Sequence, residues 1–240
     1  MNKVTLTKMP ELPYAMEEAL NRLRINIGFL GNDIKKIMVV STLPNEGKSF
    51  IAIHLWEQMI KAGTPSVYLD ADLRKSITMT KYGIESDGKK KIEGTSQYLA
   101  GNKHIKDVIL HTDIEGGDLL PNVENVVNPS MLLESHRFEE MLDYMAENYR
   151  YVFIDSPPLN LVSDGERIGS MCDGAILVVR GGETSRNMVR NSIQMLERAG
   201  CPLLGIVLNR VKGSKGGYYY KRYGGYYGGK YGEGEYYASK

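Results

Sequence analysis

The stretch IMVVSTLPNEGKSF (residues 37–50) joins a continuous apolar run to a turn and then to an apolar-rich segment. The run predicts a buried strand over 34–41, and the spacing after the turn predicts a helix over 50–63, ended by a glycine. A strand, a tight turn and a helix in this order are typical of an α/β fold.

The same alternation continues toward both ends of the chain. Apolar runs predict further strands, and amphipathic segments predict helices, so we expect a mostly parallel central sheet flanked by helices. Residues 81–94 look like an exposed loop. The expected strands are 66–72, 116–121, 151–155, 174–180 and 202–211, and the expected helices are 14–30, 95–101, 129–149 and 185–200.

The composition of the chain excludes several classes of protein. A net charge of +1, with 25% charged residues, does not favour nucleic-acid binding. The two cysteines form no metal or disulfide pattern, and the four histidines lack ligand spacing. Without a signal peptide or an apolar stretch of about 18 residues, the chain is expected in the cytosol.

The composition changes clearly only once, near Lys212. We therefore expect an N-terminal extension with a helix (1–33), one folded domain (34–212) and a flexible tail (213–240). Nine of the sixteen tyrosines lie in this tail, interleaved with nine glycines. Ordering glycine costs the most backbone entropy, so helix and strand are disfavoured there.

Two interpretations of the tail stay open on composition alone. It is either an adhesive low-complexity segment or a set of phosphate acceptors. The candidate acceptors are Tyr218, Tyr219, Tyr220, Tyr223, Tyr226, Tyr227, Tyr231, Tyr236 and Tyr237.

The turn after the first strand is a candidate phosphate loop. Backbone N–H groups of residues 44–49 can surround a phosphate, Lys48 adds charge, and the hydroxyl of Ser49 can reach Mg²⁺. The strict pattern has glycine where this chain has Thr42. A GKS tripeptide alone is often an ordinary turn. We interpret it as a phosphate loop because it lies between a predicted strand and a predicted helix.

Carboxylates follow two other predicted strands. Asp70 and Asp72 are two residues apart, so in a strand they face the same side, where their charges repel unless a cation lies between them. Asp155 ends an apolar run, and the prolines after it prevent the strand from continuing. In an open α/β sheet these strand ends share one edge, where ligands bind. The sequence therefore predicts a nucleotide and metal site there.

These segments together resemble the bacterial tyrosine kinases of capsule and exopolysaccharide systems. That family has a Walker A motif PxEGKS, a Walker A′ motif DxDxR after an apolar run, and a Walker B motif that ends D[ST]PP. This chain has PNEGKS (44–49), DADLR (70–74) and DSPP (155–158), and it ends in a tyrosine cluster as the family does. The likeness covers nearly all of residues 14–240.

The resemblance implies an ATP- and Mg²⁺-dependent protein-tyrosine kinase that phosphorylates its own tail. Lys48 would bridge the phosphates, Asp70 would accept the phenol proton, and Asp155 would support the metal. The expected metal ligands are Ser49, Asp72 and Asp155. The residues expected at the nucleotide are Pro44, Asn45, Glu46, Gly47, Lys48, Ser49, Phe50, Arg74 and Asn209.

The roles of two of these residues stay open. Arg74 is either a γ-phosphate contact or a member of a structural ion pair. Asn209 either touches the adenine edge or is an ordinary polar strand end.

The resemblance also implies partners: a transmembrane activator that recruits the kinase to the inner face of the membrane, a tyrosine phosphatase, and further copies in a ring. The N-terminal helix would pack subunits through the family motif ExxRxxR. Here the motif begins at Glu18, and Asn21 replaces its first arginine. Since one residue turns a side chain about 100° around a helix axis, Arg22 is not a simple substitute.

Two alternatives compete with the kinase interpretation. One is a nucleotide-switched assembly ATPase related to MinD and ParA, with an adhesive tail. Those proteins carry a second lysine where this chain has Leu43, which argues against that interpretation. The other is a non-catalytic aromatic scaffold, which would not bind ATP.

Overall fold

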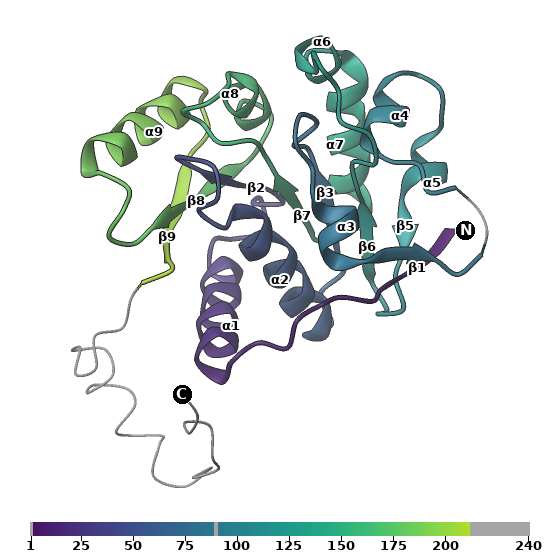
Figure 1. The fold of residues 1–240 in the computed structure, drawn as a ribbon, viewed down its shortest axis with the longest axis horizontal. Coiled ribbons are helices and arrows are strands. Elements are labelled where there is room, and N and C mark those ends of the chain that lie inside the picture. The colour runs from purple at the N-terminus through teal and green to yellow at the C-terminus, as the bar shows by residue number, and fades with distance from the viewer. Residues whose placement is uncertain (1, 89–90, 212–240) are drawn as a thin grey trace, which may run out of the picture.

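The computed structural model describes residues 2–88 and 91–211, and the tail with its nine tyrosines lies outside them. Strands and helices alternate along most of the chain (Figure 1). The strands are β1 (Asn2–Leu6), β2 (Lys36–Ser41), β3 (Ser66–Asp70), β4 (Ile84–Ser86), β5 (Leu110–His111), β6 (Gly117–Leu120), β7 (Tyr151–Asp155), β8 (Gly174–Arg180) and β9 (Leu203–Asn209). The helices are α1 (Tyr14–Gly28), α2 (Lys48–Lys61), α3 (Thr78–Tyr82), α4 (Thr95–Leu99), α5 (Ile105–Val108), α6 (Ser130–Leu133), α7 (His136–Asn148), α8 (Asp164–Gly169) and α9 (Arg186–Arg198).

The described strands form one mixed sheet in the order β4-β1-β5-β6-β3-β7-β2-β8-β9. Strands β6, β3, β7, β2, β8 and β9 run parallel to their neighbours in this row, whereas β4 and β5 are antiparallel to β1 and β6 respectively. The expected mostly parallel α/β fold is thereby confirmed. The carboxyl ends of β2, β3 and β7 lie side by side at one edge.

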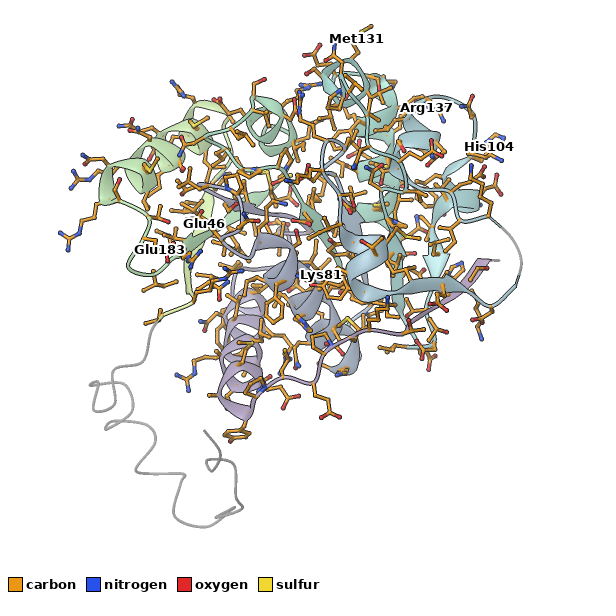
Figure 2. The ribbon with its side chains drawn as sticks, in the orientation of Figure 1. Glu46, Lys81, His104, Met131, Arg137 and Glu183 are labelled. Atoms are coloured by element: carbon orange, nitrogen blue, oxygen red, sulfur yellow. The ribbon has the colours of Figure 1, made fainter. Side chains whose placement is uncertain are left out.

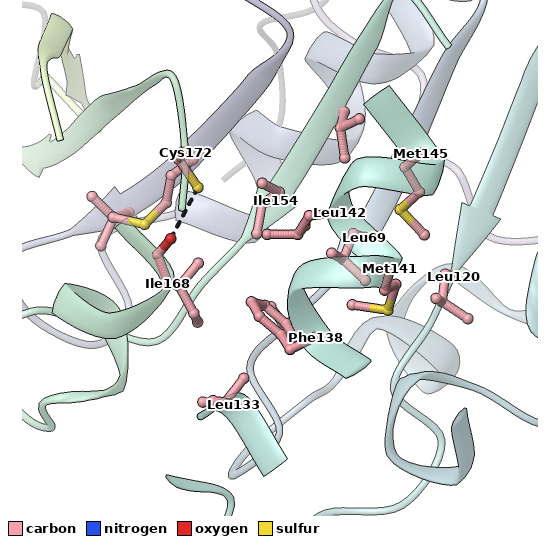
Figure 3. Packing of buried hydrophobic residues seen from close by; sticks show 14 of the residues in the cluster. Leu69, Leu120, Leu133, Phe138, Met141, Leu142, Met145, Ile154, Ile168 and Cys172 are labelled. Carbon is pink, nitrogen blue, oxygen red and sulfur yellow. Dashed lines mark hydrogen bonds between the residues drawn. The ribbon is translucent and has the colours of Figure 1, made fainter. Parts of the chain in front are cut away.

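Two helix layers cover the sheet. Met38 and Val40 of β2 pack in a core with α4 to α9, part of which Figure 3 shows around Phe138. Ile37 and Val39, which alternate with them, pack in a second core with α1, α2 and α3. Because successive side chains of a strand point to opposite faces, a strand covered on both faces is apolar throughout.

The structure differs from the sequence prediction at several places: α3, α5, β5 and α8 were not expected, and three further differences concern β1, β4 and the helix over 129–149. Residues 2–6 form β1, where no strand was expected, and pair with Ile84–Ser86 of β4 in the supposed loop 81–94. Both strands are short and carry alternating polar residues, so neither contains a continuous apolar run. The expected helix over 129–149 is split into α6 and α7, because Ser135 between them adopts an extended backbone and its hydroxyl bonds Leu132 O at 2.6 Å.

Candidate active site

The phosphate loop, residues 42–49, connects β2 to α2 and depends on glycine at one position. Gly47 is the N-cap of α2 and has a left-handed backbone, with φ +103°. A Cβ atom built on it would lie 2.2 Å from Nδ2 of Asn209, much closer than any real contact. Glycine is therefore required by its backbone angle and by its neighbour, independently of any ligand.

Glu46 holds the loop to the segment after β8. Its carboxylate accepts hydrogen bonds from Leu43 N at 2.8 Å and Arg180 N at 3.2 Å, and it contacts the hydroxyl of Thr184. Figure 2 labels Glu46 close to Glu183, which belongs to the segment after β8. These three donors offset the cost of burying the carboxylate, so the side chain positions the loop, and its backbone N–H is the group left for a phosphate.

Lys48 lies between the ends of β3 and β7, as the sequence predicted. Its Nζ is 3.1 Å from Asp72 Oδ2, 3.4 Å from Asp155 Oδ1 and 3.3 Å from the hydroxyl of Ser49. Burial alone would lower the pKa of Lys48, but three nearby carboxylates, Asp155 foremost, outweigh it and hold this pKa above its usual value.

Asp70 and Asp155 face each other across adjacent parallel strands, since the register pairs them directly. The side chain of Asp70 is fully buried, and its oxygens accept bonds from Asp72 N at 3.2 Å and from the Ser76 hydroxyl at 2.5 Å. Burial, and then the charge of Asp155, raise the pKa of Asp70 to about 7. The carboxyl of Asp70 therefore loses its proton close to neutral pH, rather than near pH 4 as an ordinary aspartate does.

Strand β3 ends at Asp70 rather than at the expected residue 72. The N–H of Asp72 bonds the carboxylate of Asp70, and Leu73 N bonds Ala71 O at 3.0 Å, which turns the chain out of the sheet. The carboxylate of Asp72 nevertheless reaches Lys48, so the two aspartates still act on one cation.

Tyr68 is a site residue that the sequence analysis missed. Its hydroxyl donates to Asp155 Oδ2 at 3.0 Å and lies 3.2 Å from the hydroxyl of Thr78. It therefore fixes the carboxylate of Asp155 from the side opposite Lys48 and ties α3 to the site. In the sequence, this tyrosine is hidden within an apolar run.

The structure agrees with what comparison with known proteins finds. The AAA domain family matches residues 34–174. The tyrosine-protein kinase CpsD of Streptococcus agalactiae is 34% identical over 82% of this chain and 85% of its own length. The kinase domain of Escherichia coli tyrosine kinase ETK superposes with a TM-score of 0.73 and 27% identity, covering 83% of this chain and 79% of that one.

The chain belongs to the bacterial tyrosine-protein kinases. Like the P-loop proteins of this family, the kinase binds a nucleotide together with a divalent metal. MinD from Pyrococcus horikoshii, with a TM-score of 0.62 and 22% identity over 76% of this chain and 72% of that one, shares the fold alone. No helix among the described residues is long and apolar enough to cross a membrane.

In this kinase Arg74 forms a structural ion pair. Its Nε is 2.5 Å from Asp164 Oδ2, and its Nη2 is 3.0 Å from Asp164 Oδ1. The hydroxyl of Ser130 also contacts Asp164 Oδ1 at 3.2 Å. The side chain of Asp164 is 2% exposed, so the guanidinium neutralises a buried charge and joins the end of β3 to α8.

Asn209 closes the phosphate loop from the end of β9. Its Nδ2 donates to Glu46 O at 2.8 Å, and its Oδ1 accepts from Arg210 N at 2.9 Å. The residue is therefore more than an ordinary strand end, because it supports the backbone next to Gly47.

The side chains around Lys48 fit a magnesium site. Within residues 2–88 and 91–211, no group of three His, Cys, Asp or Glu residues could hold a metal by itself. Magnesium, however, is usually bound by one or two carboxylates together with water and substrate phosphates. The hydroxyl of Ser49 and the carboxylates of Asp72 and Asp155 are such oxygen donors, and the ammonium of Lys48 stands among them as a cation.

Proposed function

We propose that this tyrosine kinase transfers the γ-phosphoryl group of ATP to tyrosines of its own segment 213–240. The observation that carries the proposal is the position of Lys48. Its ammonium lies between Asp72 and Asp155, at the start of a helix and beside a phosphate loop, with Asp70 next to it. Phosphoryl transfer requires mainly this kind of positioning and charge neutralisation.

The cluster suggests how nucleotide binding proceeds. Lys48 neutralises the carboxylates of Asp72 and Asp155 in the structure. Ser49 and Asp72 would hold Mg²⁺ when ATP binds, and Asp155, fixed by Tyr68, would support its shell. A bound Mg²⁺ would supply positive charge that offsets the negative charge of the β- and γ-phosphates. Lys48 would then contact those phosphates in place of its two carboxylates.

Asp70 is the group we assign to accept the phenol proton. A tyrosine hydroxyl has an unperturbed pKa of about 10, so a base beside it is useful at neutral pH. The pKa of Asp70, raised to about 7 by burial and by Asp155, makes it a stronger base than an ordinary carboxylate. The hydroxyl of Ser76 orients one of its oxygens.

The tail supplies acceptors of the right kind. Nine tyrosines among nine glycines can enter an active site in extended form, and each phosphate adds about −1.5 to −2 charge. Several phosphates would turn a mildly basic segment strongly acidic, and so could loosen an assembly of kinases by repulsion. We infer that this switch regulates capsular or exopolysaccharide synthesis and export, and that a tyrosine phosphatase resets it.

The remaining partners rest on the family resemblance. A transmembrane activator would bring the kinase to the inner face of the cell membrane, and copies of the chain would form a ring through α1. Asn21 bears on that ring, because its Oδ1 accepts hydrogen bonds from Arg24 at 3.0 and 2.8 Å. Arg24 is thereby held within its own helix, so ring contacts would require that pair to open.

Mass spectrometry of the chain isolated from its own cells tests the proposal. We expect a ladder of added phosphates on Tyr218 to Tyr237 that disappears in Lys48→Met. An unmodified tail in both proteins, with ATP still bound by the parent chain, would refute tail phosphorylation and favour an adhesive tail.

A second variant isolates the base. Asp70→Asn keeps the shape of the side chain and loses its basicity, so phosphotyrosine should disappear while ATP binding stays. If Asp70→Asn forms phosphotyrosine at the parental rate across pH 6 to 9, Asp70 is not the base.

A further inference from the structure

Lys81 places a positive charge next to the nucleotide site that the motifs do not include. It belongs to α3, and its Nζ lies 5.6 Å from the ring centroid of Phe50 and 5.0 Å from that of Tyr82. Phe50 directly follows Ser49 in the first turn of α2. Figure 2 labels Lys81 in front of the sheet, in the region where α2 and α3 lie.

A second set of contacts fixes α3 against the active site. Thr78, three residues before Lys81, lies on the same side of the helix because residues three apart are neighbours there. Its hydroxyl meets the hydroxyl of Tyr68, which donates to Asp155. Thr78 thus fixes the helix that carries Lys81 beside the Walker B carboxylate, and the rings of Phe50 and Tyr82 hold the ammonium itself.

Within residues 2–88 and 91–211, the ammonium of Lys81 forms no salt bridge, and the carboxylate of Asp155 acts on it only from a distance. Other lysines of the chain do form salt bridges: Lys61 pairs with Glu57 at 2.8 Å, and Lys103 with Glu93 at 2.8 Å. Lys81 instead rests on two aromatic faces, a contact that holds a cation in place without neutralising it.

The electrostatic surroundings of Lys81 are those of the active site. Burial of its inner side lowers the pKa of Lys81, while the nearby carboxylate of Asp155 raises it. The positive charges of Arg210 and Lys48 lower it further. The charge of Lys81 therefore interacts with those of Lys48 and Asp155. A bound anionic group would relieve the repulsion between Lys81, Lys48 and Arg210.

We propose that Lys81 is a second cation of the nucleotide site and binds a phosphate oxygen of the bound nucleotide. The inference rests on the proposed placement of the ATP phosphates at residues 44–49. A phosphate chain held by the N–H groups at the start of α2 lies next to Phe50, and thus within the reach of a lysine that stands over that ring. The ligand class is a nucleoside di- or triphosphate.

The acceptor tyrosine is the competing ligand for Lys81. The structure favours the nucleotide, because the ammonium lies over the ring of Phe50, in the first turn of the phosphate-binding helix. Its contact is with this helix and not with Asp70, the proposed base for the acceptor. A contact with the acceptor would change the KM for a tyrosine-containing substrate and leave nucleotide affinity as it is.

Calorimetric titration of the full-length chain with Mg²⁺·ADP and with a non-hydrolysable Mg²⁺·ATP analogue tests this assignment. We expect Lys81→Met to weaken binding by about ten- to a hundredfold, the effect of losing one charge-assisted hydrogen bond. Lys81→Arg, which keeps the charge, should stay within a few fold of the parent. Lys106→Met in α5 removes an exposed lysine at a distance and should leave the affinity unchanged; equal melting temperatures verify folding.

The pattern of losses locates the contact. Loss for both nucleotides assigns Lys81 to the α- or β-phosphate, and loss for the ATP analogue alone assigns it to the γ-phosphate; both support the proposal. Unchanged affinity in Lys81→Met, an equal loss in Lys106→Met, or a change confined to the acceptor KM overturns it. If Lys48→Met also binds both nucleotides normally, the proposed placement of the phosphates at residues 44–49 is itself wrong. The Lys48 variant therefore distinguishes a failure of the proposed function from a failure of the Lys81 assignment.

Discussion

The central strands β3, β7, β2 and β8 differ sharply from the flanking strands β4, β1, β5 and β6. The central four run parallel and are buried on both faces along nearly their whole length. The flanking four have two to five residues each and mixed directions. The side chain of Lys48 bonds Asp155 at the end of β7, Asp72 just after β3, and Ser49 in the helix that follows β2.

This difference shows that the central strands are the part of the fold that positions the active-site residues. Parallel strands covered on both faces have one register, because any slip would expose apolar side chains, and that register places Asp70 opposite Asp155. The flanking strands mainly cover the sheet edge beyond β3. We therefore expect changes in the central region to affect nucleotide binding and changes in the flank to affect stability alone.

A pair of left-handed glycines gives the largest expected contrast. In Gly47→Ala the new Cβ meets Asn209 Nδ2 and the backbone is strained at φ +103°, so nucleotide affinity should fall more than a hundredfold. Gly101 follows α4 near the flank and also has positive φ, but a Cβ atom added to it would meet nothing within 4 Å. Gly101→Ala should cost about 1 kcal/mol of stability. Calorimetry with Mg²⁺·ADP and thermal melting measure both; equal affinities of the two variants would contradict the contrast.

The central region is also the part that sequence could predict. The expected strands 151–155 and 174–180 match β7 and β8 residue for residue, since a continuous apolar run has few other interpretations. The edge rule for parallel strands then brought Lys48, Ser49, Asp72 and Asp155 together, as the structure shows them.

The parts that sequence missed depend on long-range contacts or on marginal local signals. β1 and β5 are too short or too polar for a periodic pattern, and they are strands only because each finds a partner. Glu46 bonds residues 134 and 138 positions away, and Arg74 finds Asp164 90 positions away. No spacing rule in one sequence predicts such a pair.

Breaking the Arg74 ion pair should cost stability without costing nucleotide affinity. Arg74→Ala leaves the carboxylate of Asp164 buried and unpaired, for an expected loss of about 1–3 kcal/mol in the free energy of unfolding. Lys103→Ala breaks the partly exposed pair with Glu93 near the flank and should change little. Urea unfolding gives both values. A large loss of ATP affinity in Arg74→Ala at unchanged ADP affinity would instead assign Arg74 to the γ-phosphate.

Two valines separate packing from function. Val39 of β2 and Val4 of β1 are both fully or nearly fully buried in the same core. Truncating either to alanine should cost about 1–3 kcal/mol, with Val4→Ala at the lower end because the flank can relax around the gap. Only Val39→Ala, in the strand that leads into the phosphate loop, should also weaken Mg²⁺·ADP binding. Equal binding losses in the two variants would mean that the flank is coupled to the site after all.

Asp70 and Asp118 give the smallest expected contrast in stability. It is also the contrast that depends on pH. The pKa of Asp70 is raised to about 7 in the folded chain, so the folded state holds this proton more tightly than the unfolded state does. Its burial therefore costs nothing below about pH 4, and the cost grows as pH rises to about 7.

Asp70→Asn should consequently stabilise the nucleotide-free kinase by about 1–2 kcal/mol at pH 8, and by much less at pH 5. The gain is partly offset because Lys48 loses one of the carboxylates that stabilise its charge. Asp118 of β6 is the matched residue in the flank, where it accepts hydrogen bonds from His111 at 2.9 Å and from the hydroxyl of Tyr149. Asp118→Asn should destabilise at both pH values. Thermal melts of the two variants and the parent at pH 5 and 8 decide the matter: a gain in Asp70→Asn that does not depend on pH would show that the Asp70 carboxylate is not strained by its burial.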